Sequence, residues 1–138
     1  MLKRALALPC AALLALGFSA CAKSVSTSGL KGEAKSAAET IKNLQSDVTA
    51  GDQKKVCQDD LAKALVRKLS ATRGGCEKAV EGQLTEIDSF EVTVEAVQVS
   101  AGTATAHVKS VYSGKNRLRT LSLVKEGAKW KISALSAS

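Results

Sequence analysis

The sequence predicts an α+β domain in which N-terminal helices pack on a curved, antiparallel four-stranded meander. Two patterns carry this prediction. Between residues 33 and 87 apolar residues recur every three or four positions, as they do on one face of a helix. From residue 90 onward they alternate with polar residues, as in strands that bury one face, and Gly102, Gly114 and Gly127 divide this stretch at near-regular intervals. Helices followed by strands are typical of an α+β fold.

The first 20 residues predict an export signal. Two basic residues precede an apolar run over residues 5–18, which at 14 residues is too short to span a bilayer. The run leads into Phe-Ser-Ala-Cys, which resembles a bacterial lipobox, although Phe18 stands where leucine is usual. The resemblance implies that Cys21 receives a diacylglyceryl group and becomes the first residue of the mature protein. Ordinary signal cleavage, with Cys21 incidental, is the alternative.

Residues 21–32 predict a flexible tether, because they are small, polar and rich in Gly and Ser. Such a segment reaches on average less than about 20 Å, so the domain at residues 33–138 should lie close to the membrane. We therefore expect an exported protein at the outer face of the cell membrane, with the membrane as its partner through Cys21. Basic and acidic residues are interspersed, without a basic run between aromatics, so nucleic acid is not an expected partner.

The cysteines predict one disulfide. Of the four in the chain, Cys10 leaves with the signal and Cys21 takes the lipid, so Cys57 and Cys76 remain as the only pair. In an oxidising compartment these two should be bonded, and closing a loop of roughly 20 residues stabilises the fold by about 3 kcal/mol. Two thiols without a nearby histidine fall short of the four ligands that zinc prefers. We expect neither a metal nor a cofactor.

The helical part should contain three helices. The first starts at residue 33 and ends near Gly51, and Asp52 is placed to cap the second. The third should cover residues 76–86. The apolar stripe of the first helix consists of Ala34, Ala37, Ala38, Ile41, Leu44 and Val48.

The cysteine pair also predicts a break in the second helix. If this helix ran unbroken to residue 70, Cys57 would lie about 20 Å from its end. To bond, Cys57 must come within about 7 Å of Cys76. We therefore predict a break at Asp59 and Asp60, which are good N-caps for a new helical segment. The disulfide would then join the first turns of the second helix to the start of the third.

The remaining residues should form four strands joined by the glycine turns. In the first strand Val92 and Val94 share one parity, whereas Val97 and Val99 share the other. A bulge near Ala96 would return all four side chains to one face. The four predicted strands cover residues 90–99, 103–109, 118–125 and 129–135.

Three features of this arrangement resemble the small envelope lipoproteins of the nuclear transport factor 2-like (NTF2-like) superfamily. They are the Gly51-Asp52 turn, the pair of cysteines at 57 and 76, and the closing segment 123–132, which ends in Trp-Lys-Ile. The resemblance implies a cone: a strongly curved sheet wrapped around a long helix, with an apolar cavity at one end. Larger members carry extra short strands among the helices, and none is evident in this sequence.

If the cavity is present, the apolar residues of the inward parity should line it. A plainly packed core with no room for a ligand is the alternative reading of the same residues. The set comprises Phe90, Val94, Ala106, Val108, Tyr112, Leu121, Leu123, Trp130 and Ile132.

The sequence offers little sign of catalysis. Enzymes of the superfamily, of the ketosteroid isomerase and dehydratase types, place Asp or His on the concave face of the sheet. The sole histidine, His107, has the outward parity, and Asp59 and Asp60 are explained by capping. No buried titrating group beside a second carboxylate is evident, and no nucleophile motif is present.

We therefore expect a non-enzymatic, lipid-anchored binding or interaction module. Its partner would be a small lipophilic ligand in the cavity or a protein of the envelope. An isomerase- or dehydratase-like enzyme of the same fold is one alternative, and a scaffold subunit of an envelope complex is another. The fold alone does not choose among these, because it hosts enzymes, carriers and scaffolds.

Overall fold

The structure is a computed structural model that describes residues 27, 29–84, 91–112 and 114–137. The predicted export signal, Cys21 and most of the tether lie outside the described residues, as does Phe90. No helix in the described ranges is long and apolar enough to cross a membrane.

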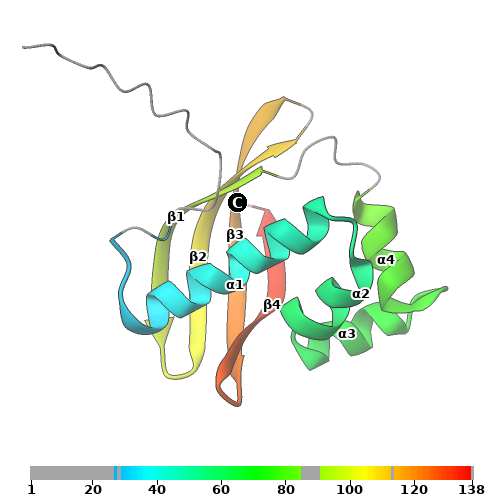
Figure 1. Cartoon of the computed structure of the whole chain (residues 1–138), viewed down its shortest axis with the longest axis horizontal. Coiled ribbons are helices and arrows are strands. Elements are labelled where there is room, and N and C mark those ends of the chain that lie inside the picture. The colour runs from blue at the N-terminus through cyan, green and yellow to red at the C-terminus, as the bar shows by residue number, and fades with distance from the viewer. Residues whose placement is uncertain (1–26, 28, 85–90, 113, 138) are drawn as a thin grey trace, which may run out of the picture.

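Helices form one layer of the domain and a curved four-stranded antiparallel sheet forms the other (Figure 1). The predicted α+β fold is therefore confirmed. The helical elements are α1 (Gly32–Thr49), α2 (Gln53–Lys55), a π-helical turn (Val56–Asp60), α3 (Lys63–Ser70) and α4 (Gly75–Leu84). The strands run in the order β1-β2-β3-β4, with bounds Glu91–Ser100, Thr103–Tyr112, Lys115–Glu126 and Lys129–Ala137.

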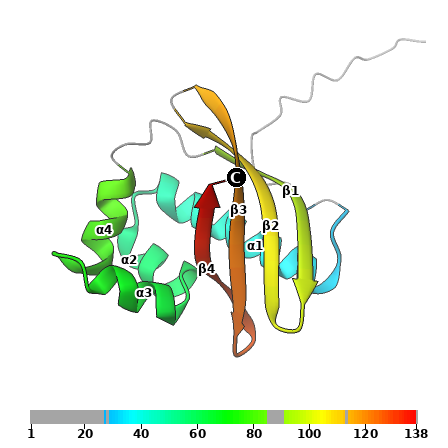
Figure 2. The same cartoon turned by 180° about the vertical axis from the view of Figure 1, so that it is seen from behind.

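The two groups of helices have different positions. Helix α1 crosses one face of the sheet, and α2, α3 and α4 gather beside β4, as the two opposite views show (Figures 1 and 2). The other face of the sheet is free of helices in the second view (Figure 2). The prediction that the helices pack on one face of the sheet is therefore confirmed for α1, whereas α2, α3 and α4 lie beside the edge strand β4.

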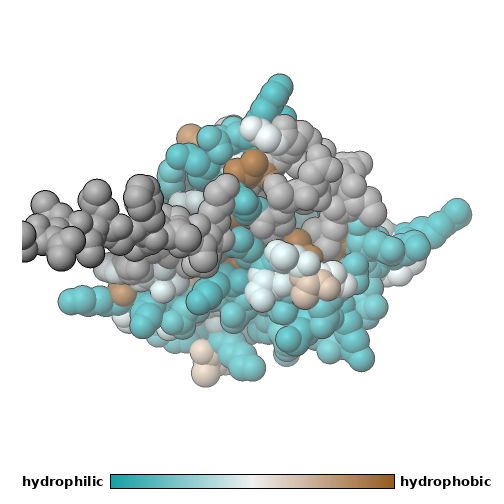
Figure 3. Space-filling view, turned by 45° about the horizontal axis from the view of Figure 1, so that its top comes forward, coloured by the Kyte–Doolittle hydropathy of each residue, from teal (hydrophilic) through white to brown (hydrophobic). Residues whose placement is uncertain are grey.

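The core lies between α1 and the sheet. Its helical side is the predicted stripe, of which Ala37, Ala38, Ile41 and Leu44 are buried. Apart from Trp130, the strands contribute small or branched side chains, which lets the helix approach closely. The surface seen in Figure 3 is mostly hydrophilic, with apolar side chains in separate small patches. The strand residues of the core are Val92, Ala104, Ala106, Val108, Leu121, Leu123, Trp130 and Ile132.

The predicted bulge in the first strand is confirmed. The register of β1 against β2 shifts between Val94 and Ala96, which brings Val97 to the same face as Val92. A second shift lies opposite Ser122 and Leu123, in β4, and nothing in the sequence indicated it. The turn glycines at 102, 114 and 127 all have φ between 63° and 81°, a region that residues other than glycine rarely adopt.

The predicted break in the second helix is confirmed, but its cause is different. Leu61 leaves the helix with extended backbone and forms an isolated parallel bridge with Ile132 of β4. The N–H of Ala62 donates to the carbonyl of Ile132 at 2.8 Å. Pairing with the sheet edge, rather than a cap, therefore ends the helix. Among the described residues this bridge is the only trace of an extra strand between the helices.

The predicted caps are partly wrong. Asp52 does cap α2, because its side chain accepts from the N–H of Lys55 at 3.0 Å. Asp59 and Asp60 do not cap α3; they are the last two residues of the π-helical turn. The first free N–H of α3, on Lys63, instead donates to Glu126 Oε1 of β3 at 2.9 Å. The side chain of Glu126, distant in sequence, thus accepts the hydrogen bond that a local cap was expected to accept.

The predicted disulfide is present. Cys57 lies in the π-helical turn and Cys76 in the first turn of α4, with their Cα atoms 6.2 Å apart. Both residues are 7% exposed. The bond therefore ties the start of the helical cluster to its last helix, as expected.

Candidate functional site

The predicted cavity residues largely share one environment. Six of the nine are buried in the core against α1: Ala106, Val108, Leu121, Leu123, Trp130 and Ile132. Val94 is half-buried beside them. Phe90 and the side chain of Tyr112 lie outside the described residues. The inward face was therefore predicted correctly for the described members, whereas the cavity itself stays a prediction.

His107 is exposed, as its parity predicted. Its Nδ1 lies 3.5 Å from the hydroxyl of Thr120 on the neighbouring strand. Both side chains belong to the sheet face that α1 does not cover. His107 is therefore not placed to act inside the core.

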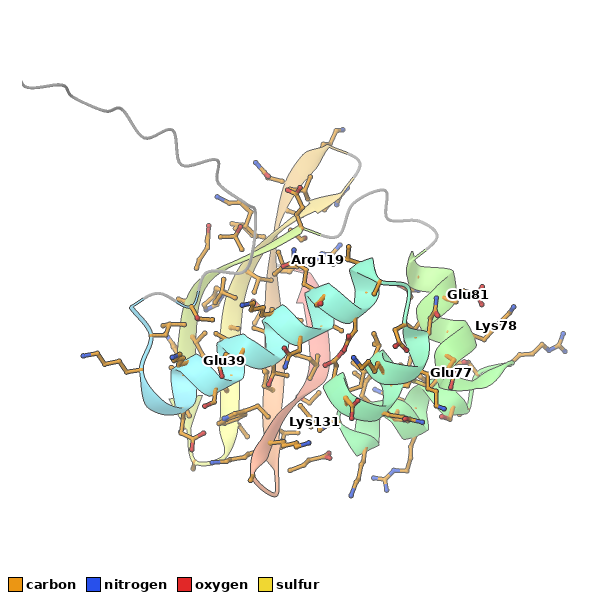
Figure 4. All side chains as sticks on the ribbon, in the orientation of Figure 1. Glu39, Glu77, Lys78, Glu81, Arg119 and Lys131 are labelled. Atoms are coloured by element: carbon orange, nitrogen blue, oxygen red, sulfur yellow. A yellow bond between two sulfur atoms is a disulfide. The ribbon has the colours of Figure 1, made fainter. Side chains whose placement is uncertain are left out.

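A polar groove of about 640 Å³ lies between α1, the π-helical turn and the β3–β4 hairpin. Six of its residues belong to α1: Ser36, Glu39, Thr40, Asn43, Ser46 and Asp47. Opposite them lie Lys55, Asp59, Asp60, Ala128, Lys129 and Trp130. Figure 4 shows Glu39, one of the lining residues, on α1. No sequence pattern indicates this groove, because its walls come from three separate segments.

One wall of the groove is fixed by a network around Trp130. The indole N–H donates to Glu33 Oε2 at 2.6 Å, and the hydroxyl of Thr40 donates to the main-chain carbonyl of Trp130 at 3.2 Å. The ammonium of Lys125 lies 2.5 Å from Glu33 Oε1 and 5.9 Å from the centre of the indole ring. Hydrogen bonds from Lys125 and then Trp130 hold the pKa of Glu33 below its usual value. The network holds the first turns of α1 on the β3–β4 hairpin.

Asp60 is the most unusual residue of the groove. It is only 2% exposed, and its Oδ2 atom has no hydrogen-bond partner among the described residues. Burial raises the pKa of this carboxyl to about 7; the charge of Asp47, a side-chain hydrogen bond with Asp47 and the charge of Asp59 raise it further, and Lys131 opposes them. Asp60 therefore changes charge near neutral pH.

The surroundings of Asp60 come from several elements. Asp47 of α1 faces it and lies 3.5 Å from the ammonium of Lys55. The ammonium of Lys131 donates to the main-chain carbonyls of Asp59 and, at 3.5 Å, of Gln58. The cations near Asp60 are thus already engaged with other groups.

The pairing of Asp60 with Asp47 corrects an expectation from the sequence. The sequence indicated no buried titrating group beside a second carboxylate, whereas the structure contains one. The two residues are far apart in sequence, and local capping was a sufficient explanation for Asp60 alone. Their contact depends on the π-helical turn, which has no sequence signature of its own. The ranges that the structure describes hold no group of three or more His, Cys, Asp or Glu residues fit to bind a metal ion.

Comparisons with known proteins find only distant structural similarity. No protein-family model matches the chain, and no curated protein matches it either. A designed NTF2 protein is 18% identical, over 72% of this chain and 94% of its own length, with a TM-score of 0.49. A protein of Campylobacter jejuni, named as an NTF2-like transpeptidase, is 16% identical over 70% of this chain and 95% of its own, also with a TM-score of 0.49. Both names are those of the superfamily that the sequence resembles, and at this level of similarity neither bears on function.

Proposed function

We propose that the protein is a non-enzymatic binding module of the cell envelope, held at the outer face of the cell membrane by a lipid on Cys21. The polar groove carries the binding part of this proposal. Asp60 in its lining is buried against Asp47, with which it shares a hydrogen bond only while one of the two carboxyls holds a proton, so the ionised pair lacks a donor that a ligand or ordered water could supply. The Cys57–Cys76 disulfide supports the export part, because such bonds persist in oxidising compartments.

Three kinds of partner are compatible with such a module. The groove suits a small polar ligand. The apolar cavity predicted around Phe90 and Tyr112 would suit a small lipophilic ligand instead. A scaffold in an envelope complex would need neither site, and its partner would be another envelope protein.

Native mass spectrometry of the full chain, purified from its own membrane fraction in mild detergent, tests this function. We expect a diacylglyceryl mass on Cys21, the loss of two hydrogens at Cys57 and Cys76, and a retained small molecule. Lipidated protein without any small molecule would contradict the binding role and favour the role of a scaffold in an envelope complex. A chain that begins elsewhere, with no lipid on Cys21, would contradict the anchored location.

A second candidate, an enzyme, is favoured by one observation. The buried carboxyl of Asp60 lies against the half-buried carboxyl of Asp47 and titrates near pH 7, and such pairs can act as general acid and base. Purified protein given fresh amounts of the small molecule that it retains would distinguish the two roles. A binding module returns the molecule unchanged, whereas an enzyme converts it and an Asp60→Asn variant does not.

A further inference from the structure

The groove lacks a donor at one defined point. Asp60 and Asp47 line a groove of mostly polar side chains, the Oδ2 atom of Asp60 is buried without a partner, and the two carboxyls can share a hydrogen bond only while one of them holds a proton. A protonated amine offers three N–H donors and a positive charge in a small volume. Seated in the groove beside Asp60 and Asp47, it would neutralise the pair and supply the donors that two ionised carboxylates lack.

Acidic groups outnumber basic ones along the groove. Four carboxylates line it, from Glu39, Asp47, Asp59 and Asp60, against the ammonium groups of Lys55 and Lys129. Of these two, Lys55 is already paired with Asp47 and its side chain is 58% exposed, so it can swing away into solvent. The groove is thus locally acidic on a chain whose formal net charge is +7.

The spacing of the carboxylates favours an elongated ligand. Glu39 and Asp47 are eight residues apart on α1, which corresponds to about 12 Å along the helix axis. Between them Thr40, Asn43 and Ser46 present hydroxyl and amide oxygens as acceptors. A metal ion would need its ligands gathered at one point, and the described residues offer no such group. A flexible chain with several ammonium groups can reach both ends.

We propose that the polar groove binds a linear aliphatic polyamine, with one primary ammonium held by Asp60 and Asp47 and a second directed toward Glu39. This inference names the ligand class for the binding role proposed above and rests on that role. If the protein retains a different small molecule, the binding role stands and this inference fails. If it binds nothing, both fail.

Binding should depend on pH through the groups that face Asp60. These are Asp47 from α1, Asp59 from the π-helical turn and Lys131 from β4. The amine stays protonated over the relevant range, because its pKa lies near that of lysine. Asp60, with a pKa of about 7, is mostly ionised at pH 8.5 and mostly neutral at pH 5.5. The affinity should therefore be about 30-fold higher at pH 8.5, the ratio of the two ionised fractions.

Isothermal titration calorimetry of the lipidated, disulfide-bonded full chain with spermidine tests the proposal. We expect the Asp60→Asn variant to bind spermidine at least about ten-fold more weakly at pH 8.5, because the carboxylate is replaced by a neutral amide of the same shape. Asp52→Asn is the matched control, since Asp52 lies outside the groove lining and asparagine caps a helix equally well. It should bind as the wild type does.

Two further titrations separate this site from general electrostatic attraction. Lys55→Gln should bind spermidine about three-fold more tightly, because it removes the ammonium that competes for Asp47. Magnesium chloride alone should give weaker binding than spermidine at equal concentration. Wild-type affinity in Asp60→Asn, equal affinity at the two pH values, or tighter binding of magnesium would each overturn the proposal.

Discussion

The half of the molecule formed by α1 and the sheet is held together differently from the half formed by α2, α3 and α4. In the first, a continuous set of buried aliphatic side chains joins one long helix to four strands. In the second, the helices are short, and α3 has no buried residue at all. That half adds only a few buried apolar residues to the same core, such as Val56 and Val80, and it is also held by a disulfide, by the bridge of Leu61 to β4, and by the contact of Lys63 with Glu126.

The difference shows where stability and function can be separated. Apolar packing fixes the sheet and α1, and leaves little freedom to change a side chain there. The groove lies at the seam between the two halves, where polar and charged side chains can vary without emptying the core. The seam can therefore tolerate the buried carboxylate of Asp60, whereas the apolar core between α1 and the sheet could not. The four predictions that follow test this division.

The largest effect should come from the core of the first half. Ile41 is fully buried on α1, and Ile41→Ala should lower the free energy of unfolding by about 3–4 kcal/mol through the cavity that it leaves. Urea denaturation followed by circular dichroism measures this loss. Leu118→Ala is the control, since Leu118 is 58% exposed and its truncation should cost less than about 0.5 kcal/mol. Equal losses for the two variants would mean that α1 does not define the core.

The second prediction concerns the disulfide. Replacing Cys57 and Cys76 together by alanine should lower the free energy of unfolding by about 3 kcal/mol, because the unfolded chain loses its closed loop. Hydrogen exchange should show where the loss is concentrated: amides of α3 and α4 should lose more protection than those of β2 and β3. Equal loss of protection throughout would show that the two halves unfold as one unit.

The sequence was sufficient to predict the half formed by α1 and the sheet. It predicted much less of the half formed by α2, α3 and α4. Periodicity identified the buried face of α1, and parity identified the inward strand residues and the bulge after Val94. Both follow from local geometry, which depends on a few neighbouring residues. The break before α3 was predicted from the reach of the disulfide, yet it is produced by pairing of Leu61 with Ile132, 71 positions later.

The candidate site was beyond the sequence for the same reason. Asp60 and Asp47 are brought together by a π-helical turn, and each was plausible as an ordinary polar residue by itself. Likewise, the contact of Glu33 with Trp130 joins residues 97 positions apart. Local patterns report which face of an element is buried, but not which polar residues of distant elements meet.

The third prediction concerns Asp60 and pH. Its pKa is raised in the folded protein, from 3.8 to about 7, so the folded state holds a proton that the unfolded state releases. Stability should therefore fall as the pH rises from about 4 to about 7, by no more than about 4 kcal/mol. Asp60→Asn should be more stable than the wild type at pH 8 by about 2 kcal/mol, and this advantage should shrink toward pH 4. Thermal unfolding across this pH range measures it, and a constant difference would contradict the raised pKa.

The smallest effect should come from Glu33, at the exposed end of the α1–hairpin contact. Its pKa is lowered in the folded protein, so its contribution is present above about pH 4.5 and is lost as the pH falls through the folded value. Glu33→Gln should therefore lower the melting temperature slightly at pH 7 and not at pH 3, because it loses the charge that attracts Lys125.

Trp130 is the only tryptophan in the chain, so its fluorescence reports on this contact directly. A glutamine oxygen can still accept from the indole N–H, whereas Glu33→Ala cannot, so only the alanine variant should shift the emission. The same shift in both variants would mean that the charge on Glu33, and not its hydrogen bond, holds α1 on the hairpin.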